Sequence, residues 1–189
     1  MRKFTDRITL GALCGLLAGV PPKMFNALEY HKGLTDERYS QTASSVLLPR
    51  TAAMSHSTGS KIIAALVNNT VVGVSGVIIA YLLSLSGRDR AVMKGAFFGA
   101  VEWIFIWGLA GRLGLKVMSR KPLTHILSFI DHVMFGAGTA ALVSRLGDDS
   151  LFPDTGTLAP GEKLPLASNS PQRLWLRRKR PGERLKGSA

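Results

Sequence analysis

Charged residues are nearly absent from four long apolar stretches of the chain, at about residues 8–28, 62–85, 91–110 and 123–143. Each stretch is close to the roughly 20 apolar residues that a helix needs to cross the hydrocarbon core of a bilayer. A soluble helical bundle would need polar faces on these helices, and the second and third stretches lack such faces. The pattern therefore predicts an all-α, polytopic membrane protein whose transmembrane domain, residues 1–146, is a four-helix bundle.

A cleaved signal peptide is the alternative for the first stretch, because basic residues precede it. Asp6 lies among those cations, however, and no small-x-small cleavage site follows before Pro21 and Pro22. We therefore expect the first stretch to be retained as a helix that the two prolines kink.

The composition changes sharply after Arg145, and residues 147–189 are expected to form a disordered, basic cytoplasmic tail. Residues 148–170 are rich in Pro, Gly, Ser and Asp, which is typical of disorder. Basic and apolar residues then alternate in a pattern that fits adhesion to anionic lipids. The residues expected to contact the membrane surface are Arg173, Trp175, Arg177, Arg178, Lys179 and Arg180. A solvated charge run that contacts nothing is the alternative.

The net charge of +12 raises the question of nucleic-acid binding. The cations flank the apolar stretches or collect in the tail, which is typical of a membrane topology and argues against a nucleic-acid partner. The N-terminal cations, Arg88, Arg90 and Arg145 all fall on one side if both termini are cytoplasmic. Cations between the third and fourth stretches lie on the opposite side and weaken the difference in positive charge between the two sides. We expect a multi-pass protein of the prokaryotic plasma (inner) membrane with both termini in the cytoplasm.

Small residues recur every four positions in three of the stretches, so that one side of each helix is smooth. Such faces let helix backbones approach closely in a bilayer, where apolar burial does not drive association. The sets are Gly11, Gly15 and Gly19, then Gly95 and Gly99, then Gly136 and Ala140. The first set favours packing within one bundle, and a homodimer or a contact with another membrane protein is the alternative.

Glu102 lies near the middle of the third stretch, where an ionisable group costs roughly 2.5–3.5 kcal/mol. With the third and fourth helices antiparallel, His132 lies about one turn from Glu102 in depth. His125 is seven residues before His132 and shares its face, and Asp131 flanks that face. The candidate intramembrane polar site is Glu102, His132, His125, Asp131, Asn68 and Asn69. Nearly all of this polarity falls in the outer half, which predicts a cavity open to the outer side with Glu102 near its floor.

Three interpretations of these polar residues remain open. Glu102 and His132 form a structural pair, or Glu102 exchanges a proton with a transported substrate, or His125, His132 and Glu102, with Asp131 as a further ligand, bind a divalent metal. The spacings match no sharp metal motif, so we expect no cofactor, and no catalytic arrangement is visible. The leading interpretation is a non-enzymatic structural, assembly or stress-related membrane protein. A small proton- or cation-coupled transporter is the alternative.

Residues 29–60 form a polar outer loop, in which we expect a short surface helix from about Thr35 to Val46.

Two short motifs, Leu16-Leu17-Ala18-Gly19 and His132-Val133-Met134-Phe135-Gly136, resemble small bacterial inner-membrane proteins of the YagU and YqhR type. The similarity covers about residues 5–145. It implies a glycine-rich first helix, a polar outer loop, and a last helix bearing a His followed by apolar residues and Gly. It implies no catalytic residues.

Overall fold

Four helical segments of the computed structural model are long and apolar enough to cross a membrane: Arg7–His31, Thr58–Ser86, Ala91–Gly108 and Pro122–Leu146. The structure describes residues 3–55, 57–109, 119 and 121–152, and this part of the chain is mostly helical and contains no strand. The four helices predicted from the apolar pattern are thereby confirmed. The tail residues Arg173, Trp175, Arg177, Arg178, Lys179 and Arg180 lie outside the described residues.

The first segment consists of two helices, α1 (Arg7–Ala18) and α2 (Val20–His31), which meet at Gly19. Asp6 begins α1, because its side chain accepts a hydrogen bond from the backbone N–H of Thr9 at 2.6 Å. Two prolines stand in the first turn of α2, where a backbone N–H would have no helical partner in any case. The kink predicted at the prolines is therefore a break at Gly19, after which a second helix begins.

The other long helices are α5 (Thr58–Ser86), α6 (Ala91–Trp103) and α8 (Pro122–Leu146). Gly87, with a φ of 83°, makes the tight turn between α5 and α6. Directly after Trp103, α6 continues as one π-helical stretch, η1 (Ile104–Leu109). Such insertions occur often at functional sites because they change the direction in which side chains point.

Glycine contacts hold α1 against α5 and α6 against α8. A Cβ atom on Gly11, Gly15 or Gly76 would lie less than 3.0 Å from the backbone of the facing helix. The same holds for Gly95 and Gly99 of α6 against α8. The first glycine face is thus covered by α5 of the same bundle, and the interpretation as internal packing is confirmed. Gly76, the matching residue on α5, was not recognised in the sequence.

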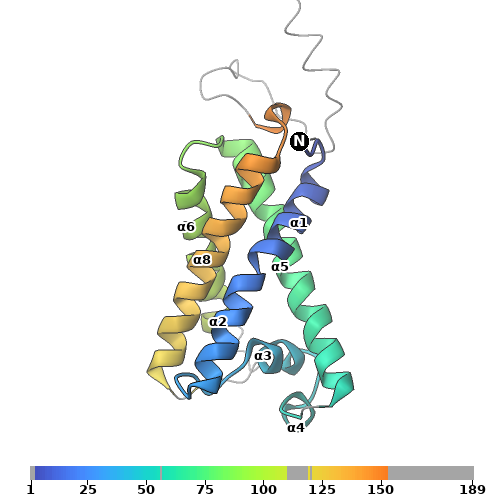
Figure 1. Cartoon of the computed structure of the whole chain (residues 1–189), viewed down its shortest axis with the longest axis vertical. Coiled ribbons are helices and arrows are strands. Elements are labelled where there is room, and N and C mark those ends of the chain that lie inside the picture. Colours follow the sequence, from blue (N-terminus) through green and yellow to red (C-terminus); the bar gives the residue numbers. More distant parts are fainter. Residues whose placement is uncertain (1–2, 56, 110–118, 120, 153–189) are drawn as a thin grey trace, which may run out of the picture.

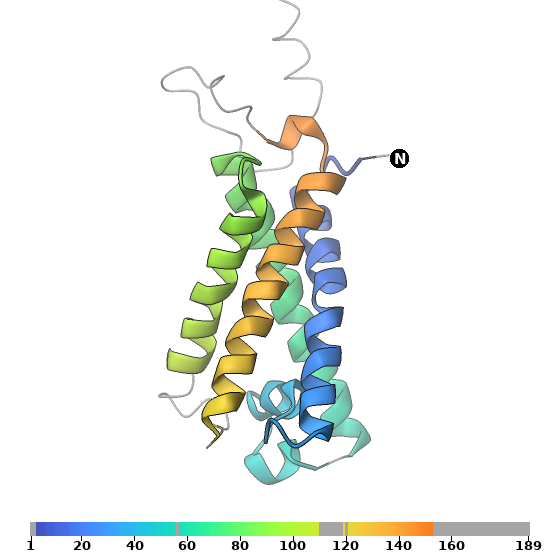
Figure 2. The ribbon, with the colours of Figure 1, turned by 60° about the vertical axis from the view of Figure 1, so that its left-hand side comes forward.

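The two helix pairs meet along α8, which packs on α1, α2, α5 and α6 (Figures 1 and 2). By contrast α5 and α6, although consecutive in the chain, make few contacts with each other.

The segment between α2 and α5 folds under the bundle and contains α3 (Tyr39–Ser45) and α4 (Arg50–Ala53) (Figure 1). A short helix predicted between Thr35 and Val46 is confirmed as α3, but its expected place at the surface is wrong on one side, because Thr35, Gln41 and Ser44 are buried. Asn26 of α2 explains the burial: its amide donates to the carbonyl of Glu37 at 3.3 Å, and its oxygen accepts from the N–H of Tyr39 at 2.8 Å. Local composition gives no sign of such a distant partner.

The residues after α8 return to the N-terminus of the chain. Phe4 N–H donates to the carbonyl of Leu146 at 3.0 Å, and Asp148 N–H donates to the carbonyl of Phe4 at 2.8 Å. Leu151 and Phe152 are buried. A disordered tail beginning at residue 147 is therefore wrong for residues 147–152, because two apolar side chains there join the core. Both ends of the described chain lie at one end of the bundle.

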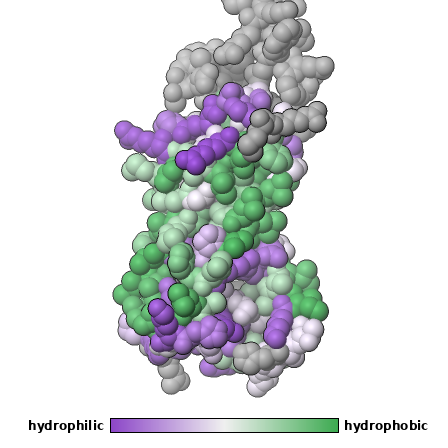
Figure 3. Space-filling model, viewed as in Figure 1, coloured by the Kyte–Doolittle hydropathy of each residue, from purple (hydrophilic) through white to green (hydrophobic). Residues whose placement is uncertain are grey.

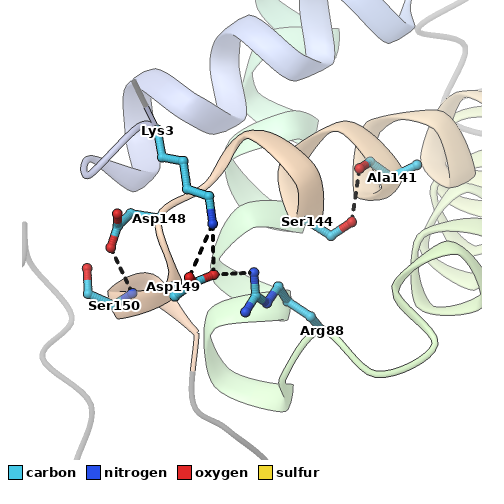
Figure 4. A network of polar contacts seen from close by, with 7 residues as sticks. All are labelled: Lys3, Arg88, Ala141, Ser144, Asp148, Asp149 and Ser150. Carbon is cyan, nitrogen blue, oxygen red and sulfur yellow. Dashed lines mark hydrogen bonds and ion pairs between the residues drawn. The ribbon is translucent and has the colours of Figure 1, made fainter. Parts of the chain in front are cut away.

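A polar network closes this end of the molecule (Figure 4). The short 3-10 helix η2 (Asp149–Leu151) presents Asp149 to two cations. Lys3 Nζ lies 3.1 Å and Arg88 Nη1 2.8 Å from the same carboxylate oxygen of Asp149. The N-terminus, the α5–α6 turn and η2 are thereby joined.

Large apolar side chains stay exposed along the helices, including Phe97 at 72%, Met93 at 67% and Leu66 at 64%. Figure 3 shows this apolar surface over the middle of the molecule, with hydrophilic residues toward both ends. A continuous apolar surface of this extent is not left in contact with water by ordinary soluble proteins.

Candidate functional site

A partly open cavity of about 260 Å³ lies in the half of the bundle that holds α2 and α3. We call it the central cavity. Its volume is close to the lower end of the range for small-molecule sites, roughly 300–1,000 Å³. Its polar wall includes Lys23, Tyr39, Asn68, Glu102, Asp131 and His132. Its apolar wall includes Val67, Val71, Val72, Ile106, Trp107 and Phe135.

Glu102 stands in the last turn of α6, directly before η1. The hydroxyl of Ser75 on α5 donates a hydrogen bond to its Oε1 atom. The Oε2 atom is buried and has no hydrogen-bond partner in the described part of the chain. A pairing of Glu102 with His132 was one of the three interpretations of the sequence, whereas Ser75, whose side chain reaches across the space between α5 and α6, was not recognised there.

Asp131 is 3% exposed, and its Oδ2 atom accepts a hydrogen bond from the hydroxyl of Tyr39 at 2.7 Å. Asp131, predicted for the site but at the flank of its polar face, lies in the wall of the central cavity. Burial, and then the carboxylate of Asp131, raise the pKa of the Tyr39 hydroxyl well above its ordinary value. Tyr39 therefore keeps its proton and remains the donor.

His132 lies in the same wall, as the depth argument predicted. Its Nδ1 atom is 2.7 Å from the carbonyl oxygen of Ser128. Because a carbonyl only accepts, Nδ1 carries a proton in this arrangement. The ring of Tyr39 packs edge-on against the imidazole, with ring centres 6.1 Å apart. Tyr39 thus contacts both adjacent residues of α8.

His125 is not part of the central cavity, although it shares a helix face with His132. Its ring packs edge-on against Trp107, with ring centres 5.2 Å apart. The two histidines are about 10.5 Å apart along the helix axis, since each residue adds about 1.5 Å. Within the described residues no three His, Cys, Asp or Glu side chains are close enough to bind a metal ion. The metal interpretation therefore has no ligand set in this part of the chain.

A second pocket of about 490 Å³ adjoins the central cavity and shares Lys23, Tyr39 and Asn68 with it. We call it the basic pocket, because its lining contains three cations and no Asp or Glu. The cations and side-chain amides are Lys23, Arg38, Lys61, Asn26, Asn68 and Asn69. Lys23 Nζ donates to Asn69 Oδ1 at 2.8 Å. The two asparagines predicted for the site are therefore divided: Asn68 lines both spaces, and Asn69 lines only the basic pocket.

Comparison of the chain with protein-family models, curated proteins and solved structures finds no match. The resemblance to the YagU and YqhR type stays a prediction. The functional argument therefore depends on the geometry of the two pockets.

Proposed function

We propose that the protein is a four-span protein of a prokaryotic plasma membrane, with both chain termini in the cytoplasm. The exposed apolar side chains of the helices support a bilayer location. The end of the bundle that carries the N-terminus also carries Lys3, Arg88, Arg90 and Arg145. Lys and Arg in short loops beside the spans favour the cytoplasmic side, and cations such as Lys32, Arg50 and Lys121 toward the opposite end reduce this bias. The central cavity then lies in the outer half of the membrane.

Within that membrane we propose a small proton-linked transporter whose substrate site is the central cavity. The observation that carries this proposal is the Oε2 atom of Glu102, buried in the cavity wall without a hydrogen-bond partner among the described residues. A buried carboxylate with an unpaired oxygen is costly, and a proton or a bound cationic or donor group removes the cost. Substrate entry and proton exchange at Glu102 are therefore linked.

A structural or assembly role is the second candidate. The hydrogen bond between Ser75 and Glu102 favours it, because this bond joins α5 to α6 where the two helices otherwise make few contacts. In that case the hydrogen bond of Glu102 holds α5 and α6 together, and protonation of Glu102 has no role in transport. We propose a non-enzymatic function for the protein in both cases.

Labelling with dicyclohexylcarbodiimide in native membranes separates the two candidates. This apolar reagent modifies carboxyl groups that are protonated and accessible from the bilayer or a cavity, and mass spectrometry identifies the modified residue. We expect modification at Glu102, because its side chain lines the central cavity and its Oε2 atom has no hydrogen-bond partner within the described residues. Glu102→Gln should abolish the signal, and Asp89, exposed and paired with Lys94, is the internal control that stays unmodified.

The opposite result would favour the structural role. An unmodified Glu102 at every pH, together with a Glu102→Gln variant that is merely less stable, would mean that the carboxyl is sealed in the bundle. The transport proposal would then be withdrawn.

A further inference from the structure

We infer that the central cavity and the basic pocket together bind an anionic amphiphile, an acyl chain with a carboxylate or phosphate head group. This inference rests on the proposed function, because it names the class of molecule that enters the central cavity. The head group lies in the basic pocket and the chain in the central cavity.

The charge of the basic pocket selects the head group. Lys23, Arg38 and Lys61 line it, and none of them takes part in an ion pair within the described residues. The Nε atom of Arg38 is buried and has no hydrogen-bond acceptor there. Cations without counter-charges, next to side-chain amides that donate hydrogen bonds, favour carboxylate or phosphate.

The central cavity suits an acyl chain. Valine side chains from α5, namely Val67, Val71 and Val72, face Phe135 of α8 and Ile106 of η1 around it. Lys23, Tyr39 and Asn68 belong to the walls of both spaces, so one molecule can occupy both. An acyl chain with one anionic end therefore matches the apolar wall of the central cavity and the cations of the adjoining basic pocket.

The acids of the central cavity fix the orientation of the ligand. Glu102 and Asp131 would repel an anionic head group that entered beside them. The same two residues would attract a cationic head group, which the basic pocket would reject. An anionic head group in the basic pocket, with its chain in the central cavity, avoids both repulsions.

The basic pocket is also placed where lipid head groups lie. It is formed at the end of the bundle that holds the C-terminal part of α2 and the N-terminal part of α5. In Figure 3 hydrophilic surface interrupts the apolar surface in this half of the molecule. Long basic side chains near helix ends commonly extend toward the membrane interface, where they meet anionic head groups.

Fluorescence quenching tests the inference, because Trp107 lines the central cavity and Trp103 lines neither space. A full-length variant with Trp103→Phe and Trp175→Phe keeps Trp107 as its only tryptophan, and in neutral detergent micelles it is titrated with a brominated fatty acid. We expect saturable quenching by the fatty acid, and about tenfold weaker binding of the brominated amine and alcohol of equal chain length. A variant that keeps only Trp103 reports simple partition into the micelle and should show no saturation.

Lysine substitutions identify the head-group site. Lys23→Gln and Lys61→Gln should each weaken binding of the brominated fatty acid by about tenfold. Lys61 is exposed, so its substitution leaves the packing of the bundle unchanged. Lys32→Gln, at an exposed position that lines neither space, should have no effect.

The possible failures are distinguishable. Equal quenching by the acid, the amine and the alcohol would overturn the anionic head group and leave a ligand site in the central cavity. The absence of saturable quenching of Trp107 by all three would overturn the amphiphile site, while the carbodiimide labelling of Glu102 tests the proposed function separately. Displacement of the brominated fatty acid by inorganic phosphate alone would make the basic pocket a site for a free anion and overturn the requirement for a chain.

Discussion

The hydroxyl of Tyr39 donates a hydrogen bond of 2.7 Å to Asp131, a residue 92 positions further along the chain. The backbone N–H of Tyr39 also donates to Asn26 of α2 at 2.8 Å. One residue thus fixes α3 to both α2 and α8. Because α3 forms part of the wall of the central cavity, these two bonds determine the shape of the proposed site.

Replacing Tyr39 by Phe should lower the free energy of unfolding by about 1–3 kcal/mol, since the buried carboxylate of Asp131 loses its donor. Thermal or denaturant unfolding in detergent measures the change. The matched control is Tyr30→Phe, because the hydroxyl of Tyr30 makes no hydrogen bond within the described residues. Equal losses for the two variants would mean that the Tyr39–Asp131 bond contributes nothing specific.

Ser75 and Glu102 should be energetically coupled, because their hydrogen bond is buried between two helices. The single variants Ser75→Ala and Glu102→Met, and the double variant, form a cycle in which we expect a coupling of about 0.5–3 kcal/mol. Unfolding in detergent provides the four free energies. Ser144→Ala serves as the control, because this hydroxyl donates to the carbonyl of Ala141 in its own helix. If the losses of unfolding free energy in Ser75→Ala and Glu102→Met were additive, the hydrogen bond between Ser75 and Glu102 would not stabilise the contact of α5 with α6.

Hydrophobic pattern and helix geometry predict the long helices and the relative depth of Glu102 and His132, because both follow from position along a helix axis. They do not predict the rotation of a helix about that axis. Asp131 was therefore included in the predicted site but placed beside its polar face, and Ser75 was missed. Nor does composition reveal the burial of Thr35 and Glu37, since Asn26 and Thr124, which bond to this segment, belong to other helices. Distances across a bundle depend on packing, which a single sequence does not state.

The attachment of residues 147–152 to the N-terminus should weaken in acid. Hydrogen bonds from Lys3, and then from Arg88, hold the pKa of Asp149 below its ordinary value. A lowered folded-state pKa means that the contribution of Asp149 is present above the ordinary pKa of about 3.9. It is lost as the pH falls through the lowered pKa.

Hydrogen exchange of the backbone amides of Asp148 and Leu151 measures this attachment, after correction for the intrinsic exchange rate at each pH. We expect protection in the wild type that declines below about pH 4. Asp149→Asn should show lower protection that depends less on pH in this range, because only Asp148, whose pKa is lowered by its hydrogen bonds from Ser150, still titrates in this turn. Asp89→Asn, at a separate ion pair with Lys94, should behave as the wild type. Protection in the wild type that is constant down to acid pH would contradict the role of Asp149.

Two glycines of α5, three residues apart, should respond in opposite ways to the same added methyl group. A Cβ atom on Gly76 would lie less than 3.0 Å from backbone atoms of Gly11 and Gly15 on α1, so α1 and α5 would have to move apart. Overpacking of this kind costs about 1–3 kcal/mol. A Cβ atom on Gly73 would meet nothing within 4 Å, and alanine favours a helix over glycine by about 0.8–1 kcal/mol. We therefore expect Gly76→Ala to lower the unfolding temperature in detergent and Gly73→Ala to keep or raise it. If the two variants lost stability equally, helix propensity or lipid contact would govern this helix, and the close approach of α1 to α5 would not hold the bundle together.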